Sequence, residues 1–444
     1  MADDARRVSL LLGTLFGITG LGSAATAVAL PLMREDLGVD VGNATWTLSL
    51  YALMLAVATP VYGRVSDLVG VRLPLLVGVA LMSVGALMAA AAPSYAVLLV
   101  ARIVQGAGAA AIPTLGVVVV SHRYDGALRG LALGRLAGVT AALSSIGPLA
   151  GGLVEQVAGW RGVLALPVVG VLVVPLVWGA LTGQGTGASL DVLGATLVGG
   201  TAAGLVLLVQ SPATGRLVGL GGLLLLVLGT PAVARHVRRR PHGFLPRSVI
   251  TDPTVVRSAV AAAAVPSAWF GLLIAVPAVL VDDGWAAWQV GLLLVPPAVL
   301  SLVVPSYAGR LLDRIGPIRA LVLSGLLATA ALGLAVPAAA GSVPGLMLVA
   351  AALVTTAYGV GQPALSASVS AAVDADVRGA ALGVSTLIFM VGASVGSAAV
   401  GGLGEVVGIP GALAVLAFLP VLGVLVLLPE LRRSRVPDPN GVST

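Results

Sequence analysis

The feature that most constrains this sequence is a succession of uncharged apolar runs, each about 18–25 residues long and separated by short polar breaks. Because an α-helix rises about 1.5 Å per residue, runs of this length suffice to cross roughly 30 Å of hydrocarbon. Strands of membrane barrels are shorter and alternate apolar with polar residues, and these runs do not. The sequence therefore predicts an all-α protein that crosses a membrane many times.

Composition agrees with a membrane protein and excludes several other classes. Hydrophobic residues make up 58% of the chain and charged residues 9%, whereas soluble proteins contain about 25% charged residues. The sequence contains no cysteine, so disulfide, zinc–thiolate and thiol chemistry are excluded. The positively charged side chains are all arginines, which together with abundant Ala, Val and Gly indicates a bacterial genome of high GC content.

The apolar runs predict fourteen membrane-spanning helices. Their approximate limits are 8–33, 44–63, 73–93, 95–120, 130–155, 161–182, 191–210, 217–234, 255–280, 287–308, 319–339, 343–368, 379–403 and 409–429. The first run contains Ala27-Val28-Ala29, which resembles a signal-peptide cleavage site. Because thirteen further spans follow, we expect this run to be an uncleaved first helix.

The distribution of arginine orients these helices. With both termini in the cytoplasm, nineteen arginines lie in inner segments and the outer loops hold only Arg34, Arg161 and Arg216. This bias follows the positive-inside rule, so we expect a multi-pass protein of the bacterial cytoplasmic (inner) membrane with both termini cytoplasmic. The basic run from Arg235 to Arg240 is then a topology signal near anionic membrane lipid, and the net charge of +6 does not indicate nucleic acid.

A duplicated pattern divides the chain into two halves. The segment GRVSDLVG at 63–70 recurs as GRLLDRIG at 309–316, and RGLALG at 129–134 recurs as RGAALG at 378–383. Parallel halves of this kind place the substrate site between them, near the middle of the bilayer. We expect the two extra helices to be peripheral and lipid-facing, and the protein to be a monomer. The predicted domains are a six-helix bundle at 1–184, two extra helices with the start of a basic cytoplasmic loop at 185–240, a second six-helix bundle at 241–430 and a cytoplasmic tail at 431–444.

These motifs resemble those of the major facilitator superfamily, and in particular of its fourteen-span drug:proton antiporter branch, over nearly the whole chain. The segment GRVSDLVGVR at 63–72 is similar to the superfamily's signature after span 2, RIVQGAG at 102–108 to its span 4 signature, and GPLAGG at 147–152 to the span 5 antiporter signature. The resemblance implies the major facilitator fold, with two six-helix bundles and two inserted helices. It also implies efflux of drugs or secondary metabolites, as in multidrug or antibiotic resistance, by alternating access and with the proton gradient as energy source instead of a cofactor.

The loop signature and span 5 supply the expected gating residues. The resemblance implies that Asp67 meets a helix N-terminus of the other half, where the helix dipole favours an anion, and so acts as a latch on the inner side. A solvated loop acid is the alternative. In span 5, small residues at four-residue spacing allow close helix packing, and Pro148 can bend the helix. The expected gating set is Gly63, Asp67, Gly70, Arg72, Asp313, Gly147, Pro148 and Gly151.

A second set of residues is expected to bind substrate. Polar and aromatic side chains deep in the spans would line an apolar pocket with sparse polar points, which is typical of small-molecule sites. Trp269 stands out because it lies in mid-span, away from the interfacial belt. Taken singly, a residue of this kind more often serves helix packing than ligand contact. The candidates are Thr19, Ser23, Gln105, Thr140, Ser144, Trp269, Phe270, Tyr358, Gln362 and Phe389.

Proton coupling is where the sequence departs from the branch it resembles. The usual aspartate of span 1 is replaced by Gly22, and no acid lies deep in spans 10 or 13, so we expect small amphipathic substrates that are neutral or weakly anionic. Arg102 lies inside span 4, where a charge costs about 2.5–3.5 kcal/mol, so it faces a cavity or a partner unless it snorkels outward. An arginine near Glu155 would favour the ionised acid, and withdrawal of that arginine would let it take up a proton. The expected coupling residues are Arg102, Glu155 and Asp282, and an exposed Glu155 at a helix end is the alternative.

Two transport functions remain open at this point. One is export by proton antiport, and the other is proton-independent facilitation or import of a small metabolite on the same fold. A membrane-embedded enzyme or a metal site would need a buried cluster of ligands or a nucleophile with its base. His122, His236 and His242 all fall in predicted cytoplasmic loops, and no Gly-rich phosphate loop is present for an ATP-driven pump. We therefore predict a transporter that is not an enzyme and binds no metal.

Overall fold

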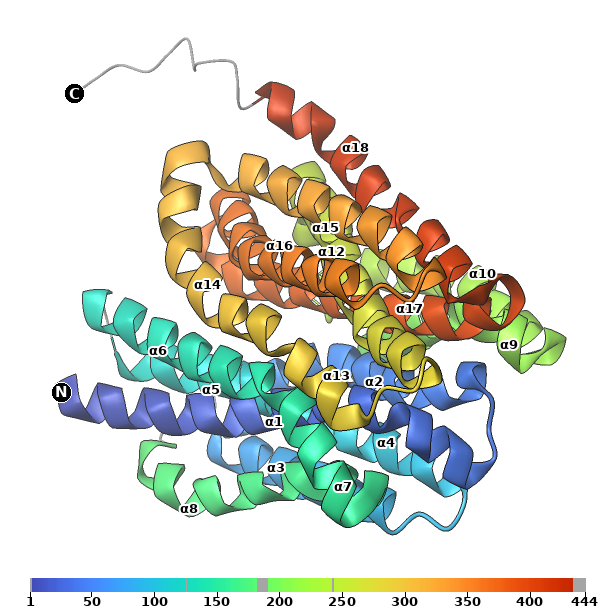
Figure 1. Ribbon diagram of the computed structural model, residues 1–444. Coiled ribbons are helices and arrows are strands. Elements are labelled where there is room, and N and C mark those ends of the chain that lie inside the picture. The colour runs from blue at the N-terminus through green and yellow to red at the C-terminus, as the bar shows by residue number, and fades with distance from the viewer. Residues whose placement is uncertain (1, 125, 182–190, 242, 434–444) are drawn as a thin grey trace.

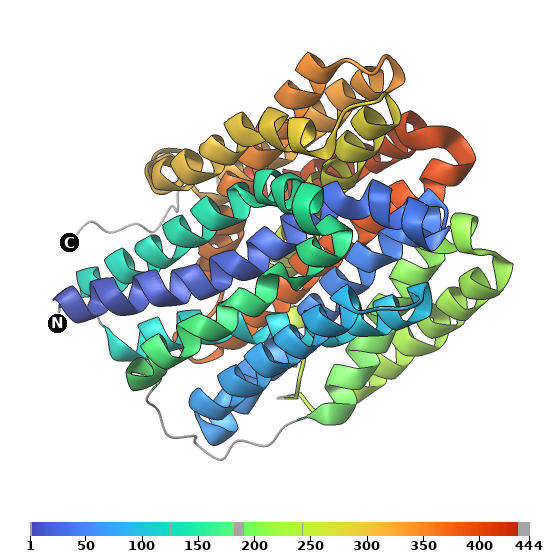
Figure 2. The same cartoon turned by 60° about the horizontal axis from the view of Figure 1, so that its bottom comes forward.

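The computed structural model describes residues 2–124, 126–181, 191–241 and 243–433, and over these residues the chain is helical without a β-strand (Figure 1). The long helices run side by side. The start of α1 (Ala2–Leu37) and the end of α18 (Phe418–Arg433) lie at the same end of the bundle, at the left in Figures 1 and 2. We call this the terminal end, and the opposite end, to which Leu37 belongs, the distal end.

The first half of the described chain extends from α1 to η2. Span 4 consists of two helices that meet near Ala110, and span 6 includes two 3₁₀ segments around a short helix. After α1, the elements are α2 (Val41–Val69), α3 (Arg72–Ala90), α4 (Tyr95–Ala109), α5 (Ala111–Arg123), α6 (Gly126–Ser145), α7 (Gly147–Ala165), η1 (Leu166–Val173), α8 (Val174–Val177) and η2 (Trp178–Ala180).

The inserted pair and the second half follow. A short connecting helix, α11, leads into the second half. The elements are α9 (Val192–Thr214), α10 (Arg216–Arg239), α11 (Arg247–Ile250), α12 (Pro253–Asp282), α13 (Ala287–Leu293), α14 (Val295–Ile315), α15 (Pro317–Ala340), α16 (Pro344–Ala372), α17 (Ala375–Leu416) and, last, α18.

Glycines in the left-handed region mark equivalent points of the two halves. Gly70 ends α2 and Gly316 ends α14, each with a φ of 81°. Gly159 interrupts α7 with a φ of 63°, and Gly408 interrupts α17 with a φ of 72°. Because a side chain disfavours positive φ, glycine is the residue that ends or turns a helix at these points. The repeat in the sequence thus corresponds to a repeat in backbone geometry.

The described helices are long and apolar enough to cross a membrane many times. By length and composition, 12 segments qualify within the described residues. Two of them, Leu131–Ala180 with 50 residues and Ala380–Arg432 with 53, contain the interruptions at Gly159 and Gly408. At about 1.5 Å per residue, each is long enough for two crossings of roughly 30 Å. The all-α membrane fold is confirmed, and the count of fourteen spans stays a prediction.

The two halves pack against each other mainly through four helix pairs, and the inserted pair lies beside one of them. These are α1 with α12, α2 with α17, α6 with α14, and α7 with α13. Helix α9 packs against both α2 and α17, whereas α10 packs on α9 and exposes a row of leucines. The expectation of a peripheral, lipid-facing pair therefore describes α10 well, whereas α9 packs one face on the α2–α17 pair and leaves the rest of its surface partly exposed.

A buried acid anchors α9 at the terminal end. Asp191 accepts hydrogen bonds from the Gly194 and Phe244 amides at 3.0 and 2.9 Å, and its carboxylate lies 2.8 Å from His236 Nε2. Burial raises the pKa of Asp191, but the hydrogen bonds from Phe244, His236 and Gly194 outweigh it and hold this pKa below its ordinary value of 3.8. The basic loop after α10 is thereby tied to the start of α9.

Candidate transport pathway

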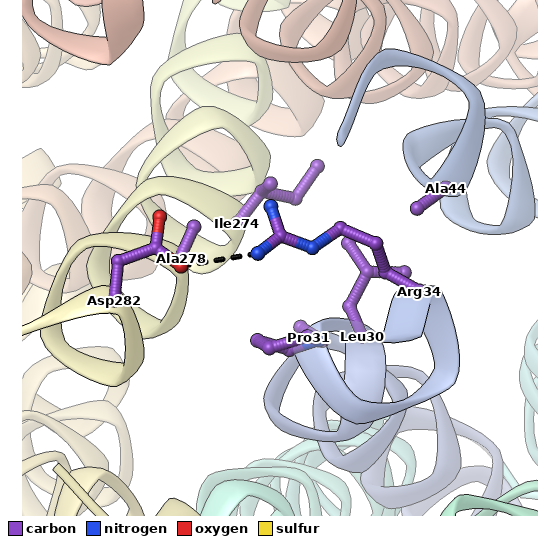
Figure 3. Close-up of a pocket in the computed structure, with 8 residues that line it drawn as sticks. Leu30, Pro31, Arg34, Ala44, Ile274, Ala278 and Asp282 are labelled. Carbon is purple, nitrogen blue, oxygen red and sulfur yellow. Dashed lines mark hydrogen bonds and ion pairs between the residues drawn. The ribbon is translucent and has the colours of Figure 1, made fainter. Parts of the chain in front are cut away.

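At the distal end, an ion pair joins the two halves (Figure 3). Arg34 Nη2 of α1 lies 3.2 Å from Asp282 Oδ1 of α12, with the two side chains 26% and 54% exposed. The pair borders a small pocket whose other walls are apolar, formed by Ala27, Leu30, Pro31, Ala44, Ile274 and Ala278. Because solvent reaches both charges, the pair contributes about 1 kcal/mol or less. It can therefore be broken at low cost when the halves separate.

Helices α2 and α17 form a second distal contact. The Gly42 amide at the start of α2 donates to Glu405 Oε1 of α17 at 3.0 Å, so an acid of the second half caps a helix of the first. Deeper in the seam, the hydroxyls of Ser49 and Ser397 are 2.9 Å apart and both residues are buried. Sequence reasoning did not select these four residues, because nothing in the sequence showed that α2 and α17 face each other.

Span 5 contacts the second half through glycines. A Cβ added at Gly152 would lie 2.7 Å from Trp288 Cα, and one at Gly291 of α13 would lie 2.7 Å from the Pro148 carbonyl. The predicted residues Gly147 and Gly151 instead pack on α1 within the first half. Pro148 stands in the first turn of α7, directly after the break that divides the predicted span 5 into α6 and α7. Small residues therefore let α7 approach a neighbour on each side.

Arg102 is fully buried in the first half. It is 1% exposed, so it does not snorkel to the surface. Its Nε donates to the Thr47 carbonyl at 2.8 Å, its Nη1 donates to Gln105 Oε1 at 2.6 Å, and its guanidinium lies 4.4 Å from the centre of the Tyr51 ring. Its Nη2 has no partner among the described residues. The predicted substrate residue Gln105 is thus a partner of Arg102, whose remaining donors are free for an anionic or polar group.

Four of the predicted substrate residues gather into one aromatic cluster in the second half. The Trp269 ring centre lies 5.0 Å from that of Phe270 and 5.6 Å from that of Tyr358, and the Tyr358 ring centre lies 5.4 Å from that of Phe389. The residues come from α12, α16 and α17. Phe389 is buried and the other three are half-buried. The packing of these three helices therefore brings the four rings together beside the core of the second half.

The remaining predicted substrate residues do not form one site. Thr19 bonds to Leu15 of its own helix and approaches Met82 Sδ at 3.6 Å, and Thr140 donates to the Gly13 carbonyl at 3.3 Å. Ser144 faces α1 closely enough that a Cβ at Gly20 would lie 2.0 Å from its Oγ. These three residues join helices of the first half. The hydroxyl of Ser23 is buried without a partner among the described residues, and Gln362 is exposed.

The predicted latch is described only in part. Gly70 ends α2, and its amide donates to the Ser66 carbonyl at 2.9 Å. Arg72 begins α3 and lies 4.7 Å from the centre of the Trp178 ring, and Gly63 lies in α2 facing Thr114. Asp313 is exposed and forms no ion pair with another described residue. The side chain of Asp67 lies outside the described residues, so the latch stays a prediction.

The structure does not bring the predicted coupling residues together. Glu155 is half-buried on α7 and forms no ion pair with any residue that the structure describes, while Arg102 bonds to groups of α2 and α4. Asp282 bonds to Arg34 of the other half. Proton coupling through any of the three stays a prediction.

The sequence matches the family description "Major Facilitator Superfamily" over residues 12–341 and 258–443. The chain therefore belongs to the Major Facilitator Superfamily. This membership supports the expectation of a transport protein. Within the superfamily, the chain is 28% identical over 334 residues to the tetracenomycin C resistance and export protein of Streptomyces glaucescens, covering 72% of this chain and 62% of that protein. It is also 30% identical over 154 residues to the efflux pump dotC of Dothistroma septosporum, covering 35% of this chain and 26% of the pump. The chain thus spans less than two thirds of the length of these curated relatives.

A solved structure supports the superfamily fold. A POT family transporter in complex with 5-aminolevulinic acid superposes with a TM-score of 0.71, covering 96% of this chain and 95% of that one at 14% identity. At this identity the likeness shows the Major Facilitator fold alone.

Proposed function

We propose that the chain is a secondary active transporter that exports drugs or secondary metabolites by proton antiport through alternating access. One observation carries this proposal. Arg34 with Asp282, the Gly42 amide with Glu405, and Ser49 with Ser397 are polar contacts that join the two six-helix bundles. All three lie toward the distal end. Alternating access needs two halves that close at one end at a time, and closure at the distal end is one of its two states.

The proposed substrates are small, amphipathic and neutral or weakly anionic. The aromatic cluster around Trp269 supports an apolar, flat ligand, and Arg102, which contacts no carboxylate among the described residues, supports a ligand with an acidic or polar group. The relative from Streptomyces glaucescens is named for resistance to tetracenomycin C and its export, which supports the direction of transport. We propose that the protein works as a monomer.

The proposed location is the bacterial cytoplasmic membrane, with the distal end outside and both termini in the cytoplasm. The arginine bias supports this orientation. Reporter fusions after Arg239 should give a cytoplasmic signal, and fusions after Asp282 an external one. A cytoplasmic signal after Asp282 would contradict both the orientation and the fourteen-span count.

Proton coupling is proposed to act on the distal ion pair or on Glu155. Arg34 and Asp282 join α1 to α12, so loss of this ion pair would favour separation of the two helices. A proton-independent facilitator is the second candidate function. It is favoured because no acid deep in the predicted spans takes the place of the usual span 1 aspartate.

Uptake by everted membrane vesicles distinguishes the two functions. Vesicles energised to an acidic, positive interior should accumulate tetracenomycin C, used as the probe, and a protonophore should abolish the accumulation. Vesicles without the protein provide the background. Equilibration that the protonophore leaves unchanged would indicate a facilitator, and Asp282→Asn compared with Glu155→Gln would show which acid couples the proton.

A further inference from the structure

Gln210 of the inserted helix α9 binds the distal end of α2 with its whole amide group. Its Nε2 donates to the Gly42 carbonyl at 2.6 Å and to Thr45 Oγ1 at 2.7 Å, and its Oε1 accepts from Ser49 Oγ at 3.4 Å. The side chain is completely buried. The Thr45 hydroxyl also donates to the Gly42 carbonyl at 2.8 Å within α2, so Gln210 adds to an existing local bond. A buried amide that bonds to three groups of one helix helps to fix that helix in position, because its own donors and acceptor are satisfied only there.

The same three residues of α2 also contact α17 of the second half. The Gly42 amide donates to Glu405, and the Ser49 hydroxyl bonds to that of Ser397. Thr45 lies so close to α17 that a Cβ added at Gly401 would fall 1.7 Å from its Oγ1. Each α2 residue held by Gln210 is therefore a contact point between the two halves.

Helix α9 also touches α17 directly, at a position without a side chain. A Cβ added at Gly402 would lie 2.5 Å from the Val209 carbonyl and 2.7 Å from Gln210 Cα. Glycine thus permits close approach of the two backbones. At the distal end, α9 is hydrogen-bonded to α2 and packed on α17, so it bridges the seam that must part when this end opens.

We propose that α9 is part of the distal gate and that Gln210 is the positioning residue that holds α2 against α17 in the distal-closed state. The proposal rests on the alternating access of the proposed function. When the distal end is closed, Gln210 and α17 supply Gly42, Thr45 and Ser49 with hydrogen bonds in addition to the one between Thr45 and Gly42 within α2. When it opens, water reaches them. Loss of the Gln210 amide therefore destabilises the closed state more than the open one.

The alternative explanation is that Gln210 only attaches α9 to α2 and has no part in the distal gate. In that case the loss of Gln210 would destabilise both states equally and leave their ratio unchanged, because only differential stabilisation shifts an equilibrium. The two explanations differ in the ratio of distal-open to distal-closed protein.

Distance measurements between spin labels can report this ratio, and the absence of native cysteine makes labelling specific. The exposed residues Glu35 of α1 and Asp283 after α12 are replaced by cysteine to report the distal end. A second sample carries labels at the exposed residues Arg7 of α1 and Arg314 of α14 to report the terminal end. Both samples are the purified 444-residue protein in lipid nanodiscs, without a proton gradient.

Three variants are compared in each labelled background. Gln210→Leu removes the amide at similar volume. Gly402→Ala leaves the amide in place but separates α9 from α17. The matched control is Thr201→Val on α9, because the Thr201 hydroxyl bonds to Leu197 of its own helix and faces Gly229 of α10 instead of the seam. Apparent melting temperature and elution volume verify that each variant is folded.

We expect Gln210→Leu to raise the distal-open to distal-closed ratio about tenfold, since two or more neutral hydrogen bonds are lost from the closed state alone. Gly402→Ala should shift this ratio in the same direction. In both variants the distance between the labels at the terminal end should shorten. Thr201→Val should match wild type at both ends. Unchanged ratios in folded Gln210→Leu and Gly402→Ala protein would overturn the proposal. These distances do not depend on substrate export or proton coupling, so failure of export leaves the result interpretable. If no sample shows a distal-open state, whatever the pH and whether or not tetracenomycin C is added, both alternating access and this proposal are wrong.

Discussion

Arg102→Lys is expected to impair transport severely although it keeps the positive charge. The guanidinium of Arg102 reaches the Thr47 carbonyl and Gln105 Oε1 with two different nitrogens and stacks over the Tyr51 ring. A lysine ammonium is a compact charge on a flexible stem and cannot reproduce this fork. Loss of one charge-assisted hydrogen bond costs about 1.5–3 kcal/mol, and loss of a desolvated cation–π contact costs about 2 kcal/mol.

The expected destabilisation is therefore about 3–5 kcal/mol, a large fraction of the 5–15 kcal/mol by which a folded protein is typically stable. Since each kcal/mol moves the melting temperature of a long chain by about 1 °C or more, purified Arg102→Lys protein should melt about 3–5 °C below wild type. Its initial rate of uptake into everted vesicles should fall at least about tenfold, because the free Nη2 donors are also lost.

Two variants serve as controls for this prediction. Arg319→Lys changes an exposed arginine and should leave both the melting temperature and the rate unchanged. Arg102→Met removes the charge and should be at least as inactive as Arg102→Lys. Wild-type transport and melting of the lysine variant would refute the reasoning, because charge alone would then suffice at this position.

Three further predictions follow from the same structure. Asp67→Asn and Asp313→Asn should both insert into the membrane normally but reduce transport unequally, and wild-type rates in both vesicle preparations would exclude the latch. Because the pKa of Asp191 is lowered in the folded protein, its stabilising effect is present above about pH 4 and is lost as the pH falls further; the acid-induced drop in melting temperature should be smaller in Asp191→Asn. Gly152→Val should force α7 away from α13, open the distal end in spin-label distances and slow transport, whereas an unchanged distance would show that α13 can yield.

Much of the fold follows from properties that are local in the sequence. Run length sets the number of residues available for each crossing, and glycine in the left-handed region ends α2 and α14 at matching points of the repeat. The burial of Arg102 was also predictable, because its depth in span 4 follows from counting turns from the nearest polar break. These features depend on position along a helix, and position along a helix can be read from sequence.

Features that depend on rotation about a helix axis and on its neighbours were decided by the tertiary structure. Trp269, Phe270, Tyr358 and Phe389 were predicted one by one, but only the packing of α12, α16 and α17 makes them a cluster. By contrast, Glu155 and Arg102 lie at similar predicted depths, yet the packing does not join them.

The role of α9 shows the same limit most clearly. Its most apolar stretch is as apolar as that of α10, so the sequence by itself determined that both helices are long and apolar enough to span a membrane and could not tell which of them packs on the two halves. One buried glutamine distinguishes them, and an isolated glutamine in an apolar run carries no signal until its partners are known. Those partners, Gly42 and Thr45, lie far away in the chain and come within hydrogen-bonding distance only because glycines on α17 let the backbones of α2, α9 and α17 approach one another.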